Sequence, residues 1–134
     1  MIIEIIPCLS DNYSYLIYEK KSNTVSIVDP AEFEGCDKVI NKYKKLDFIL
    51  NTHHHADHIG ANLELKKKYN SKILGSKLDK DRIPGIDILL KENQKQKIGN
   101  LEFEVIFIPG HTKGHIAFFL ARKKLLLQEI LYFH

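Results

Sequence analysis

The sequence has no long apolar run and only two cysteines, and each of these shortages excludes a class of protein. No stretch approaches the roughly 20 apolar residues that a transmembrane helix requires, so we expect no membrane partner. The cysteines, Cys8 and Cys36, form no C-x-x-C pair. A disulfide framework is therefore not expected, and we predict two buried free thiols in a reducing compartment.

We also expect neither a leader segment nor a nucleic-acid platform. The chain begins with a strand-like run, residues 1–6, that contains Glu4 and no basic leader, which argues against a signal peptide. The formal net charge is a mild +3, and the basic runs 66–68 and 123–124 carry no interleaved aromatic residues. Such runs are typical of solvated faces. We expect a cytoplasmic globular domain that binds no nucleic acid.

A cluster of potential metal ligands is present instead, in the segment Thr52-His-His-His-Ala-Asp-His58, with the spacing H-x-H-x-D-H. Side chains two apart in an extended segment point the same way, so His53 and His55 can bind one metal ion. Asp57 and His58 follow and offer an oxygen and a nitrogen to a neighbouring point. Imidazole and carboxylate suit zinc first, and iron or manganese next. An accidental histidine run or a tag is the alternative, but a tag usually sits at a terminus and contains no aspartate.

The flanking segments place this cluster in a loop. The apolar run 47–51 predicts a buried strand before it, and residues 60–69 predict a helix after it, with lysines facing water. A loop at the carboxyl end of a strand is where α/β folds place their chemistry.

A second candidate loop, Pro109–His115, follows another predicted strand at 101–108. His111 in this loop would complete a three-histidine set with His53 and His55. Gly110 and Gly114 permit the tight backbone that such a loop needs.

The two motifs T-H-H-H-A-D-H-I-G-A-N and P-G-H-T-K-G-H resemble those of the metallo-β-lactamase superfamily, and within it most closely those of glyoxalase II, the hydroxyacylglutathione hydrolases. The segments 10–17 and 27–30 are similar to the same family. The resemblance covers residues 1–127 and implies an α+β fold, the N-terminal part of a metallo-β-lactamase-like αββα sandwich.

The resemblance also implies roles for the histidines. It assigns five metal ligands: His53, His55 and His111 to the first ion, and Asp57 and His58 to the second. His54 occupies a variable position and is expected to pack or face solvent. His115 either orients the loop around the ligands or has only a structural role.

The implied activity is hydrolysis of a small-molecule glutathione thiolester such as S-lactoylglutathione, in methylglyoxal detoxification, by a metal-activated hydroxide. Zinc ions in two sites are the expected cofactor, with iron or manganese as alternatives. No convincing Ser/His/Asp or Cys/His constellation is present, so we predict no protein nucleophile.

Hydrophobic patterning predicts one sheet with its helices, that is, one half of the sandwich. A Gly-Asn pair at 99–100 predicts a hairpin turn, and the polar segment 91–97 predicts an exposed loop. The expected strands are 2–6, 13–18, 24–28, 47–51, 72–75, 86–90, 101–108 and 115–120, and the expected helices are 36–45 and 60–69.

The end of the chain departs from the family. The family continues into a T-G-D-T-L-F segment whose aspartate bridges both metals, then a further histidine and a helical glutathione-binding region. This chain instead ends Leu-Gln-Glu-Ile-Leu-Tyr-Phe-His at 127–134. We therefore expect an incomplete domain at 1–127, an aberrant tail at 128–134, a C-terminally truncated and incomplete second metal site, and impaired hydrolysis. The alternatives are a non-catalytic zinc-binding remnant, as a pseudogene product would be, and a mononuclear iron persulfide dioxygenase, which shares H-x-H-x-D-H.

The tail itself suggests a frameshift. A frame shifted by one base joins the last base of each codon to the first two bases of the next codon. The Gln, Glu and Ile codons at 128–130 begin with CA, GA and AT, and as the last two bases of shifted codons these allow Thr, Gly and Asp. The remaining codons to 134 allow Thr-Leu-Phe-Ser in the same frame. We predict that the coding DNA will carry this hidden reading, with the lost aspartate at about Ile130. Codons at 127–134 that are incompatible with T-G-D-T-L-F-S would refute it.

Overall fold

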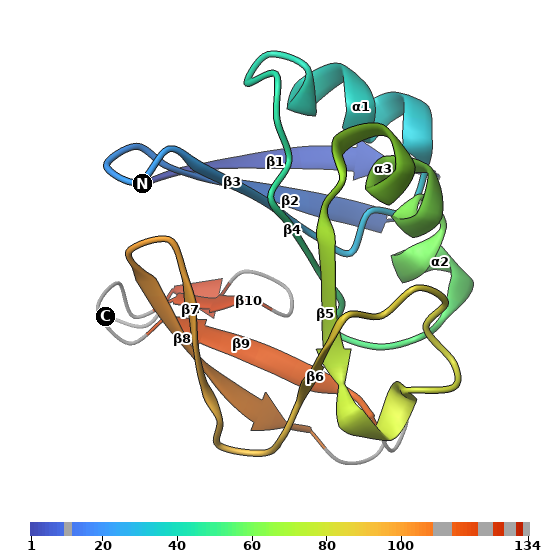
Figure 1. Ribbon diagram of the computed structural model, residues 1–134, viewed down its shortest axis with the longest axis vertical. Coiled ribbons are helices and arrows are strands. Elements are labelled where there is room, and N and C mark those ends of the chain that lie inside the picture. The colour runs from blue at the N-terminus through green and yellow to red at the C-terminus, as the bar shows by residue number, and fades with distance from the viewer. Residues whose placement is uncertain (10–11, 109–113, 121–124, 128–130, 133–134) are drawn as a thin grey trace.

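The computed structural model describes residues 1–9, 12–108, 114–120, 125–127 and 131–132, with side chains described up to residue 120 except that of Asp57. Two sheets face one another, and the helices lie along the outer side of the first sheet (Figure 1). The first sheet has the order β1-β2-β3-β4-β5-β6, and the second has the order β11-β10-β9-β8-β7. The elements are β1 (Ile2–Cys8), β2 (Asn12–Glu19), β3 (Thr24–Val28), α1 (Phe33–Ile40), β4 (Phe48–Leu50), α2 (Ala56–Ile59), α3 (Asn62–Tyr69), β5 (Lys72–Ser76), the short 3₁₀ helix η1 (Lys77–Asp79), β6 (Ile88–Leu90), β7 (Lys95–Ile98), β8 (Leu101–Phe107), β9 (Ile116–Leu120), β10 (Leu125–Leu127) and β11 (Leu131–Tyr132).

Neighbouring residues in the central strands bury their side chains in two different cores, because successive side chains of a strand point to opposite faces. The core between the sheet and the helices contains Leu16, Ile27, Ile49, Ile73, Cys36, Ile40 and Leu65. The core between the two sheets contains Ile17, Val28, Leu50, Leu74, Phe103, Val105 and Phe118. The first sheet is therefore covered on both faces.

Parallel pairing in the first sheet sets the position of the loops. β3, β4 and β5 are parallel neighbours, with Val28 beside Leu50 and Leu50 beside Leu74. The carboxyl ends of these strands therefore meet at one edge of the sheet, and the segments that follow them lie together there.

The α+β architecture is confirmed, and each predicted strand has a counterpart among β1–β6, β8 and β9. The expectation of a single sheet is wrong, since strands β7 to β11 form a second sheet that faces the first. The prediction of a loop at 91–97 is wrong for residues 95–97, which belong to β7. β7 pairs there with β8, burying Ile98 while Lys95 and Lys97 remain exposed, which is the pattern of a half-buried edge strand.

The helices also differ from prediction. α1 runs over Phe33–Ile40 rather than 36–45, because the backbone continues through i→i+3 turns and Lys44 adopts a left-handed conformation with φ of 60°. The helix predicted at 60–69 is α3, which is separated from α2 by residues 60–61. Ala61 N donates to Pro30 O at 3.0 Å, and a Cβ on Gly60 would lie 2.1 Å from Ala31 O. The segment after β3 thus packs against Gly60, and the helical path is broken at Ala61, whose φ is −102° and ψ is 3°.

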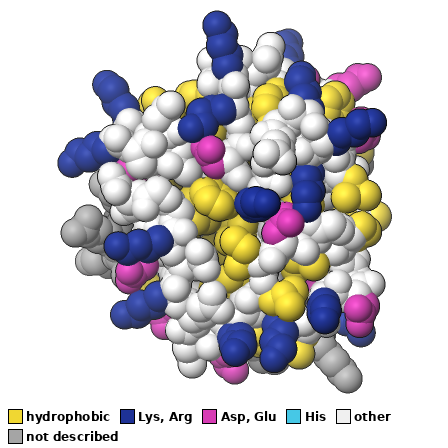
Figure 2. Space-filling model, in the orientation of Figure 1, with side chains coloured by type: hydrophobic (Ala, Val, Ile, Leu, Met, Phe, Trp, Pro, Cys, Tyr) yellow, Lys and Arg dark blue, Asp and Glu magenta, His cyan; other side chains and the backbone are white. Residues whose placement is uncertain are grey.

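The basic run 66–68 takes part in surface ion pairs. Lys66 Nζ lies 2.8 Å from Asp87 Oδ2, and Lys68 Nζ lies 2.7 Å from Asp37 Oδ2. On the face drawn in Figure 2, Lys and Arg side chains are scattered among carboxylates and apolar groups. None of the helices in the described part of the chain has the length and apolar character needed to cross a membrane.

We predict that Gly60→Ala will lower the free energy of unfolding by about 1–3 kcal/mol, because the new methyl group meets a backbone carbonyl that side-chain rotation cannot move. The matched control is Gly35→Ala in α1, where the new Cβ meets only the flexible end of Glu32, at 3.1 Å. This control should be neutral or stabilising by up to about 1 kcal/mol, since alanine is the better helix former. Urea denaturation of both variants measures the difference, and equal stabilities would contradict the proposed packing.

Candidate metal site

The histidine segment lies at the carboxyl edge of the first sheet, as predicted. β4 ends at Leu50, residues 51–55 form a loop, and α2 begins at Ala56. β3 ends beside it, so Asp29 directly follows Val28 and lies next to this loop. Asp29 N donates to Leu50 O at 2.9 Å, which joins the two strand ends.

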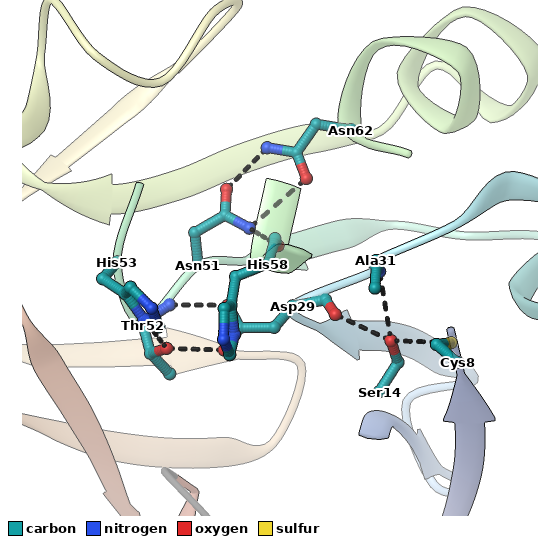
Figure 3. A network of polar contacts seen from close by, with 9 residues as sticks. All are labelled: Cys8, Ser14, Asp29, Ala31, Asn51, Thr52, His53, His58 and Asn62. Carbon is teal, nitrogen blue, oxygen red and sulfur yellow. Dashed lines mark hydrogen bonds and ion pairs between the residues drawn. The ribbon is translucent and has the colours of Figure 1, made fainter. Parts of the chain in front are cut away.

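Asp29 binds the loop through its carboxylate (Figure 3). Oδ1 accepts from Thr52 N at 2.8 Å, and Oδ2 accepts from Thr52 Oγ1 at 2.5 Å and faces His58 Nδ1 at 3.0 Å. Asp29 is 3% exposed and has a φ of 51°, a left-handed conformation that few non-glycine residues adopt. Ser14 Oγ donates to Asp29 O at 2.7 Å and so supports this backbone. Such strain tends to occur at functional sites.

These contacts determine which ring nitrogens remain available. The single hydroxyl hydrogen of Thr52 goes to Asp29, so the 3.0 Å contact of Thr52 Oγ1 with His53 Nδ1 requires the hydrogen on that nitrogen. His58 Nδ1 must likewise donate, because a carboxylate only accepts. Nε2 is then the acceptor nitrogen of the neutral ring in both His53 and His58, as a metal ligand requires.

The histidine rings cluster around His53. Its ring centroid lies 3.9 Å from that of His58, 4.8 Å from that of His55 and 4.7 Å from that of His115. His53 is 5% exposed and His115 is 8% exposed. The structure therefore brings three predicted ligands together with His115, which lies on the second loop.

Asp29, His53 and His58 form a group whose potential ligand atoms all lie within 4.8 Å of one another. Since the Asp29 carboxylate already faces Thr52 and His58 Nδ1, we assign it as the outer partner and the two imidazoles as donors, which suit a borderline divalent cation such as zinc, iron or manganese. Two predicted ligands, His111 and the side chain of Asp57, lie outside the described part of the chain. Sequence reasoning did not identify Asp29 as a site residue. The available signal was its place in segment 27–30, which resembles the family and includes the end of the predicted strand 24–28.

A pair of buried asparagines supports the far end of the loop. Asn51 Nδ2 donates to His58 O at 3.1 Å, and Asn62 Nδ2 donates to Asn51 Oδ1 at 2.6 Å. Asn62 begins α3, so this pair joins the loop to that helix. The buried amides satisfy one another and hold the backbone of His58 in place.

The two cysteines are buried free thiols, as predicted. Their Sγ atoms lie 3.7 Å apart, and Cys8 Sγ lies 3.3 Å from Ser14 Oγ, which in turn contacts Asp29 (Figure 3). Burial raises the pKa of the Cys36 thiol to about 12. Cys36 is therefore a neutral packing group beneath the site rather than a thiolate ligand.

His54, expected to pack or face solvent, lies beside a buried carboxylate. Its Nδ1 is 3.3 Å from Asp79 Oδ1, and its side chain is 26% exposed. Gly114 was predicted to permit a tight backbone, and it lies in a turn. A Cβ at this position would also meet the carboxylate of Asp79.

Comparison with known proteins agrees with this geometry. A family model described as the metallo-beta-lactamase superfamily matches residues 11–127. A hydroxyacylglutathione hydrolase of Pelagibacter ubique is 49% identical over 120 residues, which are 89% of this chain and 50% of that protein. The chain thus spans about half the length of the curated relatives it matches.

Solved structures share the fold. The B3 metallo-beta-lactamase BLEG-1 superposes with a TM-score of 0.79 at 22% identity, over 93% of this chain and 70% of that one. ETHE1 from Myxococcus xanthus superposes with a TM-score of 0.78 at 26% identity, over 90% of this chain and 54% of that one. Because the family model matches residues 11–127 and the histidine cluster lies at the sheet edge, this chain belongs to the metallo-β-lactamase superfamily.

Proposed function

We propose that this chain is the metal-binding part of a hydroxyacylglutathione hydrolase of the glyoxalase II type. The observation that carries the proposal is the 49% identity to the Pelagibacter ubique hydroxyacylglutathione hydrolase, across a region that includes the histidine cluster. The substrate class would be small-molecule glutathione thiolesters such as S-lactoylglutathione.

The proposed ligands are His53, His55 and His111 for one ion, and Asp57 and His58 for a second. The proposal is supported by the proximity of the rings of His53, His55 and His58. A bound divalent ion would supply Lewis acidity and a strong nucleophile from water at neutral pH. Zinc is the first choice for such donors, with iron or manganese as alternatives.

The chain's own contribution is to hold the ligand rings in place. Asp29 holds the His58 ring directly and the His53 ring through Thr52, so that one carboxylate orients two proposed ligands. Such outer partners fix the tautomer and make the imidazole a better ligand. A thiolester places little demand on the protein for acid catalysis, because thiols have a pKa of about 8.5 and leave readily as thiolates.

A mononuclear iron persulfide dioxygenase is the second candidate. The fold likeness to ETHE1 gives it some weight, but no more than the curated relatives give the hydrolase. Iron content and oxygen uptake of the purified protein distinguish the two. A zinc-binding remnant without catalysis is the third candidate, which the activity test below addresses.

We predict that the purified chain binds zinc and that His53→Ala abolishes tight binding, because His53 lies at the centre of the ring cluster. Asp29→Asn should weaken binding by about 10- to 100-fold, the usual effect of removing an outer-shell partner. Competition with a chromogenic chelator measures both effects. The control is Asp81→Asn, an exposed carboxylate whose loss should leave affinity unchanged. Equal affinities for all four proteins would exclude this site.

We also predict that the 134-residue chain by itself hydrolyses S-lactoylglutathione far more slowly than the full-length Pelagibacter ubique relative. The physical reason is substrate positioning. The relative is about twice as long as the matched region, and we expect the additional sequence to help hold the substrate, which makes attack on it effectively unimolecular. A thiol-release assay at saturating zinc makes the comparison. Turnover equal to that of the relative, and abolished by His53→Ala, would show that this part suffices, whereas complete inactivity with tight zinc binding would favour the remnant.

A further inference from the structure

Asp79 is a buried carboxylate between the two histidine-bearing loops. It ends η1, the turn that follows β5, and its side chain is fully buried. Oδ1 lies 3.3 Å from His54 Nδ1 and 3.5 Å from Arg82 Nη1. Oδ2 is buried and accepts no hydrogen bond from the residues that the structure describes. A buried carboxylate with an unsatisfied oxygen is destabilising, so its presence calls for an explanation beyond packing.

The local turn does not explain this carboxylate. The side chain that caps η1 is Ser76, whose Oγ accepts from Leu78 N at 3.1 Å. Asp79 contributes its main-chain oxygen, which accepts from Arg82 N and Ile83 N. Within the described part of the chain its carboxylate accepts from no backbone N–H of its own turn, and the Arg82 side chain reaches Oδ1 only at 3.5 Å, so the carboxylate also has room for contacts with other segments.

Its first distant contact is with the H-x-H-x-D-H loop. His54 lies between the proposed ligands His53 and His55, and its ring meets the ring of His55 edge-on, with centroids 5.1 Å apart and planes at 74°. This contact is one of proximity, since His54 Nδ1 makes no hydrogen bond within the described part of the chain. Asp79 thus lies against the ring that packs against His55.

Its second distant contact is with the P-G-H-T-K-G-H loop. A Cβ on Gly114 would lie 2.4 Å from Cγ and both carboxylate oxygens of Asp79. The carboxylate therefore lies directly on the backbone of this loop, where only glycine fits. The next residue, His115, has its ring 4.7 Å from that of His53. One side chain thus spans both loops.

We propose that Asp79 is a positioning residue of the metal site, which sets the separation of the two histidine-bearing loops by contacting His54 on one and Gly114 on the other. It is not a ligand and acts through its neighbours. The inference rests on the metal site proposed above. A preorganised ligand set binds metal more tightly, because less ordering is required on binding.

The test is zinc affinity of the full chain, together with the visible absorption spectrum of its cobalt(II) form, which reports ligand geometry. Asp79→Asn keeps the side-chain volume and removes the charge. We expect it to weaken zinc binding by about tenfold, the lower end of the effect of outer-shell partners, and to shift the cobalt bands. The matched control is Asp81→Asn, which removes the same charge from an exposed side chain two residues further along the chain. It should change neither the zinc affinity nor the cobalt spectrum.

A second variant keeps the test decisive if Asp79→Asn does not fold. His54→Phe retains a ring against His55 and loses the nitrogen that faces Asp79. It should give a similar loss of affinity and a similar shift of the cobalt bands. Where both variants fold, the double variant should bind zinc no more weakly than Asp79→Asn alone, because His54 acts through its contact with Asp79.

The outcomes separate this inference from the proposed function. If the unmodified chain binds no zinc, the proposed metal site fails and this inference fails with it. If the unmodified chain binds zinc and Asp79→Asn or His54→Phe changes only the melting temperature of the metal-free protein, then the metal site stands and the positioning role of Asp79 is overturned.

Discussion

The site depends on one carboxylate, that of Asp29, at the end of β3. Three donors meet it, all from the segment that follows the neighbouring strand: the amide and hydroxyl of Thr52, and the ring of His58. This works only because β3 and β4 run parallel and end together. The strained backbone of Asp29, with φ of 51°, is held by hydrogen bonds from Ser14 and to Leu50. Strain at this point is offset by the surrounding sheet.

The packing of the first sheet makes this arrangement rigid. Neighbouring residues such as Ile49 and Leu50 fill different cores, one against the helices and one against the second sheet. A shift of one residue in β4 would exchange these faces and carry the histidine loop away from Asp29. The precision of the site therefore derives from apolar burial on both sides of the strand, and the polar network only completes it.

Much of this could be predicted from local sequence. Apolar runs bounded by turn residues located the strands of the first sheet, and the H-x-H-x-D-H spacing located the ligand loop. The errors were at segments where tertiary contacts override local pattern. β7 is polar, and only its pairing with β8 and the burial of Ile98 make it a strand. α2 and α3 are separate at Ala61, which leaves the helical conformation with φ of −102° and ψ of 3° and donates to Pro30 O.

The sequence by itself determined the kinds of donor and their local order, because imidazole and carboxylate chemistry and the two-residue period of an extended segment are properties of neighbours in the chain. Only the tertiary structure decided which distant groups would hold those donors. Asp29 and His58 are 29 residues apart in sequence, and the contacts of Asp79 with His54 and Gly114 likewise join separate segments. Short patterns carry no information on such pairs, since strand order and register bring them together only in the folded chain.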